Sequence, residues 1–176
     1  MDLKKHVITG GPGSGKTTTV EALRQRGFPI IEEAARAVIE EGLRTGSEIL
    51  PWKDILTFNR RVIAVQLASE ARHTVGTVFA DRGVIDNLAY CAWGKVSPPP
   101  ELTVAAREVL YHRVFLLEPL PFHEQDLVRR ESPEDARLLG TLIREAYEDH
   151  GYDVISVPPR SVQERVEFIL QKALNV

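Results

Sequence analysis

This 176-residue sequence has only one cysteine, no long apolar run and no excess of basic charge. The single cysteine, Cys91, cannot form a disulfide within the chain, so we expect a protein of the reducing cytoplasm with Cys91 packed in an apolar helix. No apolar run approaches the roughly 20 residues of a membrane span and no signal peptide opens the sequence, so we expect no membrane insertion. The net charge of -3, with acidic and basic residues mixed along the chain, argues against a nucleic-acid partner.

Several catalytic motifs are also missing. The five histidines include no pair at metal-ligand spacing and there is no cysteine cluster, which argues against a zinc site. No serine or cysteine lies in a Gly-x-Ser-x-Gly elbow, so acyl transfer has no support. The Asn-Lys-x-Asp motif of a GTP switch is absent after the expected fourth strand, where the sequence reads LLEPLPF.

Short apolar strands alternate with helices along the chain. We expect strands at residues 4–10, 28–31, 77–80, 113–117 and 153–157. We expect helices at residues 17–26, 34–43, within 49–73 after Pro51, at 85–93 and 102–110, and from Ser161 to 174, with the SPPPE run as a loop. Continuous apolar strands of this kind are typical of a parallel sheet covered on both faces. The sequence therefore predicts one three-layer α/β domain over residues 1–176.

The most informative stretch is HVITGGPGSGKTTT. Gly10 to Thr17 match the phosphate-binding loop pattern (Gly, four residues, Gly-Lys-Thr) between an expected strand and an expected helix. Glycines let the chain turn tightly with its amides aimed at a triphosphate, and the positive end of a helix beginning at Lys16 or Thr17 acts on the same spot. We expect Lys16 to reach the β- and γ-phosphates, Thr17 to ligate Mg²⁺ and Thr18 to contact a phosphate. The predicted nucleotide-binding residues are Gly11, Gly13, Ser14, Gly15, Lys16, Thr17 and Thr18.

Asp81 comes directly after an apolar strand and so emerges at its carboxyl end, where ligands bind in open α/β sheets. There it can hold magnesium, directly or through water, opposite Thr17. The adjacent Arg82 can contact phosphate oxygens. A plain polar turn is the alternative for Asp-Arg-Gly.

Two further clusters are candidates for the acceptor side of the site. Glu32 and Glu33 follow the second strand, and a carboxylate there can take a proton from an attacking hydroxyl, with Arg36 orienting the acceptor; a charged helix start is the alternative. Asp86 and Tyr90 lie four residues apart on one helix face and can line the acceptor pocket, unless they are a solvated Asp and a packed Tyr.

A polar segment after the fourth strand contains Arg129 and Arg130. Such arginines can close over a nucleotide and neutralise charge on a transferred phosphoryl group, so we expect a lid at about residues 119–137. A solvated helix end is the alternative.

These motifs together resemble the P-loop kinase-like ATPases that carry Glu-x-x-Arg and Asp-Arg-Gly-x-x-Asp at strand ends, a group that includes ribosylnicotinamide kinase domains. The matching residues beyond the loop are Glu33 with Arg36, and Asp81-Arg82-Gly83 with Asp86 and Tyr90. The resemblance covers nearly the whole chain. It implies a five-stranded parallel sheet in which the Asp81 strand lies next to the loop strand, ATP with Mg²⁺, and a lid around Arg129 and Arg130.

The acceptor does not follow from this resemblance. Nucleoside kinases are similar in placing a catalytic carboxylate after the second strand, which favours Glu33 over Glu32 as the base. Ribosylnicotinamide kinases usually carry aromatic residues around Glu-x-x-Arg, whereas this chain has alanines and Val38 there. That substrate is therefore not carried over.

The favoured hypothesis is a kinase that transfers the ATP γ-phosphoryl group to a hydroxyl of a nucleoside-like or other small metabolite. In it, Lys16, Mg²⁺ and the lid arginines stabilise charge, while Glu33 or Asp81 deprotonates the acceptor. The second hypothesis is an ATP-binding or slowly hydrolysing module whose nucleotide state is read by a protein or lipid partner. An oligonucleotide-handling ATPase is disfavoured because the sequence offers no basic groove.

Overall fold

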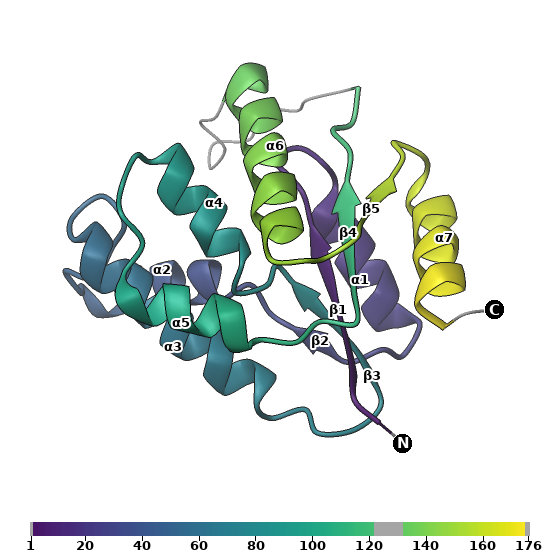
Figure 1. Cartoon of the computed structure of the whole chain (residues 1–176), viewed down its shortest axis with the longest axis horizontal. Coiled ribbons are helices and arrows are strands. Elements are labelled where there is room, and N and C mark those ends of the chain that lie inside the picture. Colours follow the sequence, from purple (N-terminus) through teal and green to yellow (C-terminus); the bar gives the residue numbers. More distant parts are fainter. Residues whose placement is uncertain (1, 122–131, 175–176) are drawn as a thin grey trace.

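A computed structural model describes residues 2–121 and 132–174 of the chain. In this part of the chain a five-stranded parallel sheet has the strand order β2-β3-β1-β4-β5 (Figure 1). The strands are β1 (Lys4–Thr9), β2 (Ile30–Ile31), β3 (Thr77–Asp81), β4 (Arg113–Leu117) and β5 (Val154–Val157). The five-stranded parallel sheet is confirmed, with the Asp81 strand directly beside β1.

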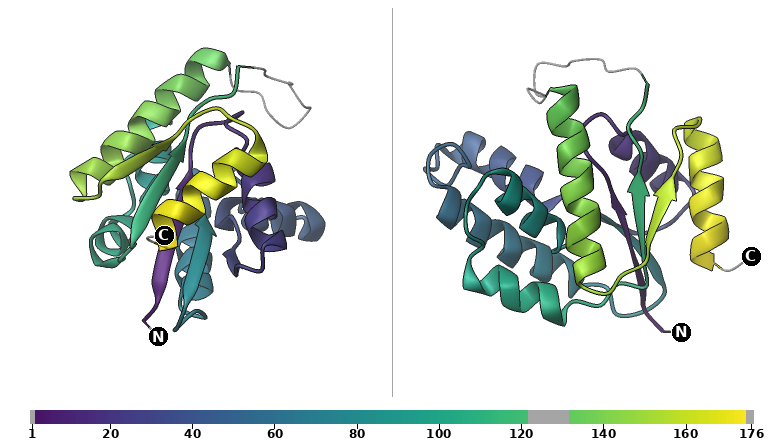
Figure 2. Two further views of the ribbon diagram at one scale, coloured as in Figure 1. Left: turned by 90° about the vertical axis from the view of Figure 1, so that its right-hand side faces the viewer. Right: turned by 45° about the horizontal axis from the view of Figure 1, so that its top comes forward.

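Helices cover both faces of this sheet, as Figure 2 shows from two further directions. The described helices are α1 (Lys16–Gln25), α2 (Ala34–Thr45), α3 (Ile55–Glu70), α4 (Asp86–Trp93), α5 (Pro100–Glu108), α6 (Pro133–Asp149) and α7 (Val162–Leu174). One core cluster joins α1 and α7 to one face, and another joins α3, α4, α5 and α6 to the opposite face. The three-layer prediction is therefore confirmed.

The central strand β1 is buried on both faces, which fixes where its carboxyl end lies. Val7 packs into the cluster with α4 to α6, and Ile8 packs into the cluster with α1 and α7; neither side chain is exposed. Burial of each such aliphatic side chain contributes about 1.5–3 kcal/mol. The loop that follows β1 consequently opens at the middle of the carboxyl edge, between β3 and β4.

Capping residues set the starts of two helices. The helix α5 begins at Pro100, within the proline run expected to be a loop, since proline suits the first helical position, where its missing N–H would be unpaired anyway. The helix α3 begins after Pro51, as expected, and starts at Ile55 because the Asp54 side chain accepts the N–H of Thr57 at 3.1 Å.

The helix α6 was not predicted. Ser132 and Asp135 form a capping box at its start, with Pro133 in the first turn, and Leu139, Ile143 and Tyr147 are buried at four-residue spacing. The last five residues of the expected lid, 133–137, therefore lie in this helix. Residues 122–131 of that segment, with Arg129 and Arg130, lie outside the described residues.

None of the helices in the described ranges is long and apolar enough to cross a membrane.

Candidate active site

The loop between β1 and α1 requires glycine at particular positions. At Gly15 the backbone φ is 76°, a left-handed value, and an added Cβ would lie 2.6 Å from Nη1 of Arg165. At Gly10 φ is 145°, and an added Cβ would lie 2.6 Å from the carbonyl oxygen of Leu117. A side chain at Gly10 would meet the backbone of β4, whereas one at Gly15 would be strained by the left-handed φ and would displace the Arg165 guanidinium. The glycine pattern is therefore needed to seat the loop on the sheet edge.

The same loop leaves backbone amides without acceptors. No hydrogen bond from the N–H groups of Gly13, Gly15, Lys16 or Thr17 to another of the described residues is found, whereas Ser14 N–H donates to the Gly11 carbonyl at 3.3 Å. The helix α1 begins at Lys16, so its positive end lies at these groups. Clustered free amides at a helix start bind anions, phosphates above all.

Lys16 is buried beside the loop, and its Nζ lies 3.4 Å from the Gly11 carbonyl oxygen. Burial, with a smaller contribution from the Arg82 guanidinium, lowers the pKa of Lys16 to about 7, although the Asp81 and Glu33 carboxylates act in the opposite direction. An anion bound against the loop would favour the charged form. The amine is thus placed to gain a proton when a phosphate arrives.

Thr17 and Thr18, which we expected to contact Mg²⁺ and a phosphate, are both exposed, but their hydroxyls differ in hydrogen bonding. Thr18 Oγ1 donates to the Gly15 carbonyl at 2.9 Å, as does Thr19 Oγ1 at 3.0 Å. Thr17 makes no such bond to the described residues, so its hydroxyl is available to a ligand. The predicted phosphate contact of Thr18 would require its hydroxyl to leave the Gly15 carbonyl or to accept a second partner.

Asp81 ends β3 and pairs in register with Ile8 of β1. Its Oδ1 is buried and has no hydrogen-bond donor among the described residues. Burial, followed by the Glu33 carboxylate, raises the pKa of Asp81 above its usual value, against the effect of Lys16. A buried carboxylate oxygen without a donor is the arrangement that a bound cation would satisfy.

Thr17 and Asp81 supply the oxygen atoms that Mg²⁺ prefers. Among residues 2–121 and 132–174, no group of three or more His, Cys, Asp or Glu side chains gathers as a metal site. Mg²⁺ usually takes one or two protein carboxylates and completes its shell with phosphates and water.

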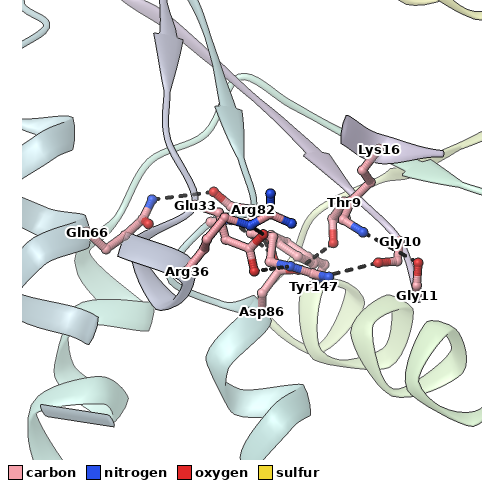
Figure 3. A network of polar contacts seen from close by, with 11 residues as sticks. Thr9, Gly10, Gly11, Lys16, Glu33, Arg36, Gln66, Arg82, Asp86 and Tyr147 are labelled. Carbon is pink, nitrogen blue, oxygen red and sulfur yellow. Dashed lines mark hydrogen bonds and ion pairs between the residues drawn. The ribbon is translucent and has the colours of Figure 1, made fainter. Parts of the chain in front are cut away.

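Arg82 lies at the centre of a polar network beside the loop (Figure 3). Its Nε donates to Glu33 Oε1, and its Nη1 donates to the Gly10 carbonyl and to Asp86 Oδ1, each at 3.3 Å. The guanidinium also lies over the Tyr90 ring, 5.1 Å from the centroid. Although burial opposes it, these neighbours, Tyr90 first and then Glu33, raise the pKa of Arg82. The arginine is a fixed positive charge.

The backbone of Arg82 is held in an unusual conformation. Its φ is 68°, a left-handed value for a residue with a side chain. The N–H of Arg82 donates to the Ile8 carbonyl at 3.0 Å, and its carbonyl accepts from Gln66 Nε2 at 3.4 Å. Two flanking elements thus impose the turn that aims the guanidinium toward the loop.

Asp86 lies against the Arg82 guanidinium and is only 1% exposed. Its Oδ1 accepts from Thr9 Oγ1 and Arg82, while its Oδ2 accepts from Gly83 N–H at 2.9 Å and Tyr147 Oη at 2.6 Å. Both oxygens are therefore engaged within the protein. The sequence suggested that Asp86 lines the acceptor pocket; the structure places it behind Arg82.

The two neighbouring glutamates lie in different surroundings. The Glu33 side chain is 22% exposed and pairs with Arg82, with its Oε2 4.0 Å from Nε of Arg36. The Glu32 side chain is 64% exposed and pairs with Arg24 at 2.7 Å. Figure 3 shows Glu33 and Arg36 beside Arg82, whose guanidinium lies between them and the loop.

Sequence reasoning missed several supporting residues. Thr9 ends β1 and Gln66 lies on α3, and nothing in the sequence marks either as a neighbour of the Arg82 turn. Tyr147 was missed with the rest of α6, whose capping box and apolar spacing were the available signals. Arg165 was missed because only the folded chain brings α7 against the loop.

A family model described as an AAA domain matches residues 5–165, so the chain belongs to this family of P-loop proteins. No curated protein matches the chain.

Several solved structures share the fold. The NadR protein in complex with NR has a TM-score of 0.73 and 18% identity over 99% of this chain, which spans about half (51%) of NadR. Thymidylate kinase from Ehrlichia chaffeensis has a TM-score of 0.66 and 14% identity over 98% of this chain and 99% of its own. Shikimate kinase from Acinetobacter baumannii, in complex with shikimate, has a TM-score of 0.61 and 18% identity over 98% and 94%. At these identities the likeness establishes the fold.

Proposed function

We propose that this protein is a kinase that transfers the γ-phosphoryl group of ATP to a hydroxyl of a small molecule. The observation that carries the proposal is the Glu33–Arg82 pair, which lies at the same sheet edge as the phosphate-binding loop and is tied to it through the Gly10 carbonyl. A loop alone suits any nucleotide-binding protein. A carboxylate and a fixed guanidinium beside that loop suit an acceptor hydroxyl and a transferred phosphoryl group.

The phosphate end of the site would be held by the free amides of the loop and by the charged form of Lys16. Thr17 and Asp81 would hold Mg²⁺, which supplies charge neutralisation between the β- and γ-phosphates when bound. We assign Asp81 to this role because its Oδ1 is buried without a donor, which suits a cation better than a substrate proton.

The acceptor end of the site would be formed by Glu33, Arg36 and Tyr90. The acceptor oxygen attacks the γ-phosphorus, the bond from that phosphorus to the β,γ-bridging oxygen breaks, and the hydroxyl proton passes to the Glu33 carboxylate. ADP is the leaving group. Arg82 would stabilise the charge spread over the phosphoryl oxygens, with Asp86 holding its guanidinium in place.

The lid belongs to the proposal as well. Arg129 and Arg130, which lie outside the described residues, would as lid arginines neutralise charge on the transferred phosphoryl group and exclude water. The names of the fold neighbours support a small acceptor: they include kinases of a nucleotide and of shikimate. ATP as the donor rests on the phosphate-binding loop and its lysine.

The experiment that tests this function incubates the purified protein and Mg²⁺-ATP with a pooled panel of nucleosides, ribosides, sugars and other metabolite alcohols. ADP and free phosphate are both followed. We expect ADP to rise with the panel while free phosphate stays flat, after which dividing the pool identifies the acceptor. Equal amounts of ADP and phosphate, indifferent to the panel, would contradict a kinase and point to an ATPase whose nucleotide state is read by a partner.

A further inference from the structure

Arg165 reaches the phosphate-binding loop from behind. It lies in the first turn of α7, is only 3% exposed, and donates from Nη1 to the Ser14 carbonyl oxygen at 2.9 Å. Its guanidinium also occupies the space next to Gly15, where an added Cβ would lie within 3.0 Å of Nη2. No function assigned above uses this residue.

The hydrogen bond from Arg165 ends on the carbonyl of the Ser14–Gly15 peptide, whose N–H belongs to the phosphate-binding loop. The Ser14–Gly15 peptide bond is trans, as are the other peptide bonds of the described residues, so the N–H of Gly15 points away from the Ser14 carbonyl at the opposite end of the same planar unit. A donor on the carbonyl therefore turns the Gly15 N–H toward the concave side of the loop. It also polarises the unit, which strengthens the N–H as a donor.

The next peptide unit is fixed separately. The Gly15 carbonyl accepts from the Thr19 N–H at 3.2 Å and from the hydroxyls of Thr18 and Thr19. Gly15 is thus held on its carboxyl side by α1 and on its amino side by Arg165. Without Arg165, the left-handed Gly15 would be free to rotate the 14–15 peptide.

The charge of Arg165 is not paired within the described part of the chain. Within the described residues no carboxylate lies in ion-pair distance of its guanidinium, and its Nε is buried without a hydrogen-bond partner. A buried cation without a carboxylate is costly unless an anion binds near it. The phosphate loop is where such an anion is expected.

We propose that Arg165 is a positioning residue for phosphate binding: it orients and polarises the Ser14–Gly15 peptide so that the Gly15 N–H binds a nucleotide phosphate, and its charge adds to the field of the loop. The proposal rests on the nucleotide-binding function above. It predicts that α7 tunes phosphate affinity without touching substrate.

The test measures the binding of Mg²⁺-ATP and of inorganic tripolyphosphate, which lacks the base and ribose, by calorimetry. We expect Arg165→Met to weaken both ligands by a similar factor of about ten, and Arg165→Lys to recover part of the loss. Arg165→Gln keeps a donor but not the charge and should fall between the other two. Arg160→Met, which removes an exposed arginine just before α7, is the matched control and should bind like wild type.

The outcomes separate this inference from the proposed function. If wild type binds neither ligand, the nucleotide-binding function itself fails. If wild type binds both and Arg165→Met binds tripolyphosphate equally well, the positioning role is overturned, and a loss confined to ATP would instead mean a contact with the base. If Arg165→Met does not fold, as judged by circular dichroism, the Lys and Gln variants decide: affinity equal to wild type in both would overturn the role.

Discussion

Lys16 is buried before any ligand arrives, with one long contact to the Gly11 carbonyl. Such an amine is disfavoured in its charged form, and its pKa is lowered to about 7 by burial. Bound phosphates would raise that pKa again. At a pH between the pKa of Lys16 in the free protein and its pKa in the phosphate-bound protein, phosphate binding must be accompanied by proton uptake.

This sets the pH dependence of nucleotide binding. At about pH 8 most Lys16 in the free protein is neutral, so binding of Mg²⁺-ATP should take up close to one proton; at about pH 6 the amine is already charged and uptake should be small. Affinity should therefore weaken as the pH rises above 7. Calorimetry in two buffers of different ionisation enthalpy measures the uptake. Lys16→Arg stays charged and should abolish it, and a wild-type binding heat at pH 8 that does not depend on the buffer would contradict the account.

Glu33 and Glu32 are adjacent glutamates in different surroundings, so the same substitution at each can be compared directly. Glu33→Gln should lower kcat by about 100-fold or more, the usual loss of a general base, while the affinity for ATP changes little. Glu32→Gln removes the same charge one residue away, from a side chain that pairs with Arg24 at the surface, and should leave kcat unchanged. Steady-state kinetics with the identified acceptor decide. Equal activity in wild type and Glu33→Gln would remove Glu33 as the base.

At the scale of elements, the Arg82 turn is held by α6 through a single side chain. Tyr147 is fully buried and donates to Asp86 Oδ2 at 2.6 Å, and Asp86 in turn fixes the Arg82 guanidinium. The helix α6 thus supports the candidate active site through Tyr147, while the Ala136 carbonyl in its first turn lies against Gly11 of the loop.

Tyr147→Phe should therefore affect both stability and catalysis. Loss of the hydrogen bond to a buried carboxylate should lower the free energy of unfolding by about 1–3 kcal/mol, and a less constrained Arg82 should lower kcat more than it changes KM. Urea unfolding and kinetics measure the two effects. Tyr152→Phe is the control: its hydroxyl donates to the Val109 carbonyl at 2.9 Å, away from Arg82, so stability should fall while kcat holds. A normal kcat in Tyr147→Phe would contradict the support role.

Elements differ in how far the sequence predicts them. The loop from Gly10 to Thr17 and the strand before Asp81 follow from local chemistry, glycine conformation and continuous apolar runs, and the structure bears out the sheet they imply. The bonds of Asp86 to Thr9 and Tyr147 join residues up to 77 positions apart, and no local pattern encodes such pairs. Glu33 was preferred to Glu32 by resemblance, and the structure adds the physical difference between them. The capping box and the apolar spacing of α6 are both visible in the sequence, but the lid expected at residues 119–137 overlaps the start of this helix.

At the scale of the whole molecule, the centre of the sheet contains an unpaired histidine. His6 on β1 is fully buried between the rings of Phe79 and His112, and neither of its nitrogens has a partner among the described residues. Burial, followed by repulsion from His112 and Arg113, lowers the pKa of His6 to about 4. The folded state therefore keeps this ring neutral where an unfolded chain would charge it.

Proton linkage makes the folded state less stable as the pH falls. Above about pH 6.5 His6 is neutral in both states and contributes no pH dependence. As the pH falls from 6.5 to about 4, the unfolded chain binds a proton that the folded state does not, so the free energy of unfolding should decrease by about 3 kcal/mol from this residue.

The measurement is urea unfolding at several pH values in wild type and His6→Leu. We expect the difference between the two stability curves to grow in favour of the variant as the pH falls through this window. His73→Gln, at a half-buried histidine, should retain the wild-type slope. Parallel curves for wild type and His6→Leu would show that His6 titrates normally in the folded protein.

The proposed kinase function requires one sheet edge to hold the triphosphate on the loop and to present its γ-phosphate to Glu33. A crystal structure with Mg²⁺ and a non-hydrolysable ATP analogue would locate each of these groups. We expect phosphate oxygens on the free amides of Gly15 and Lys16, the metal ion on Thr17 and on Asp81 directly or through one water, and the γ-phosphate facing the Glu33 side. A nucleotide bound elsewhere, or a γ-phosphate enclosed on the Glu33 side with no room for an acceptor, would contradict it.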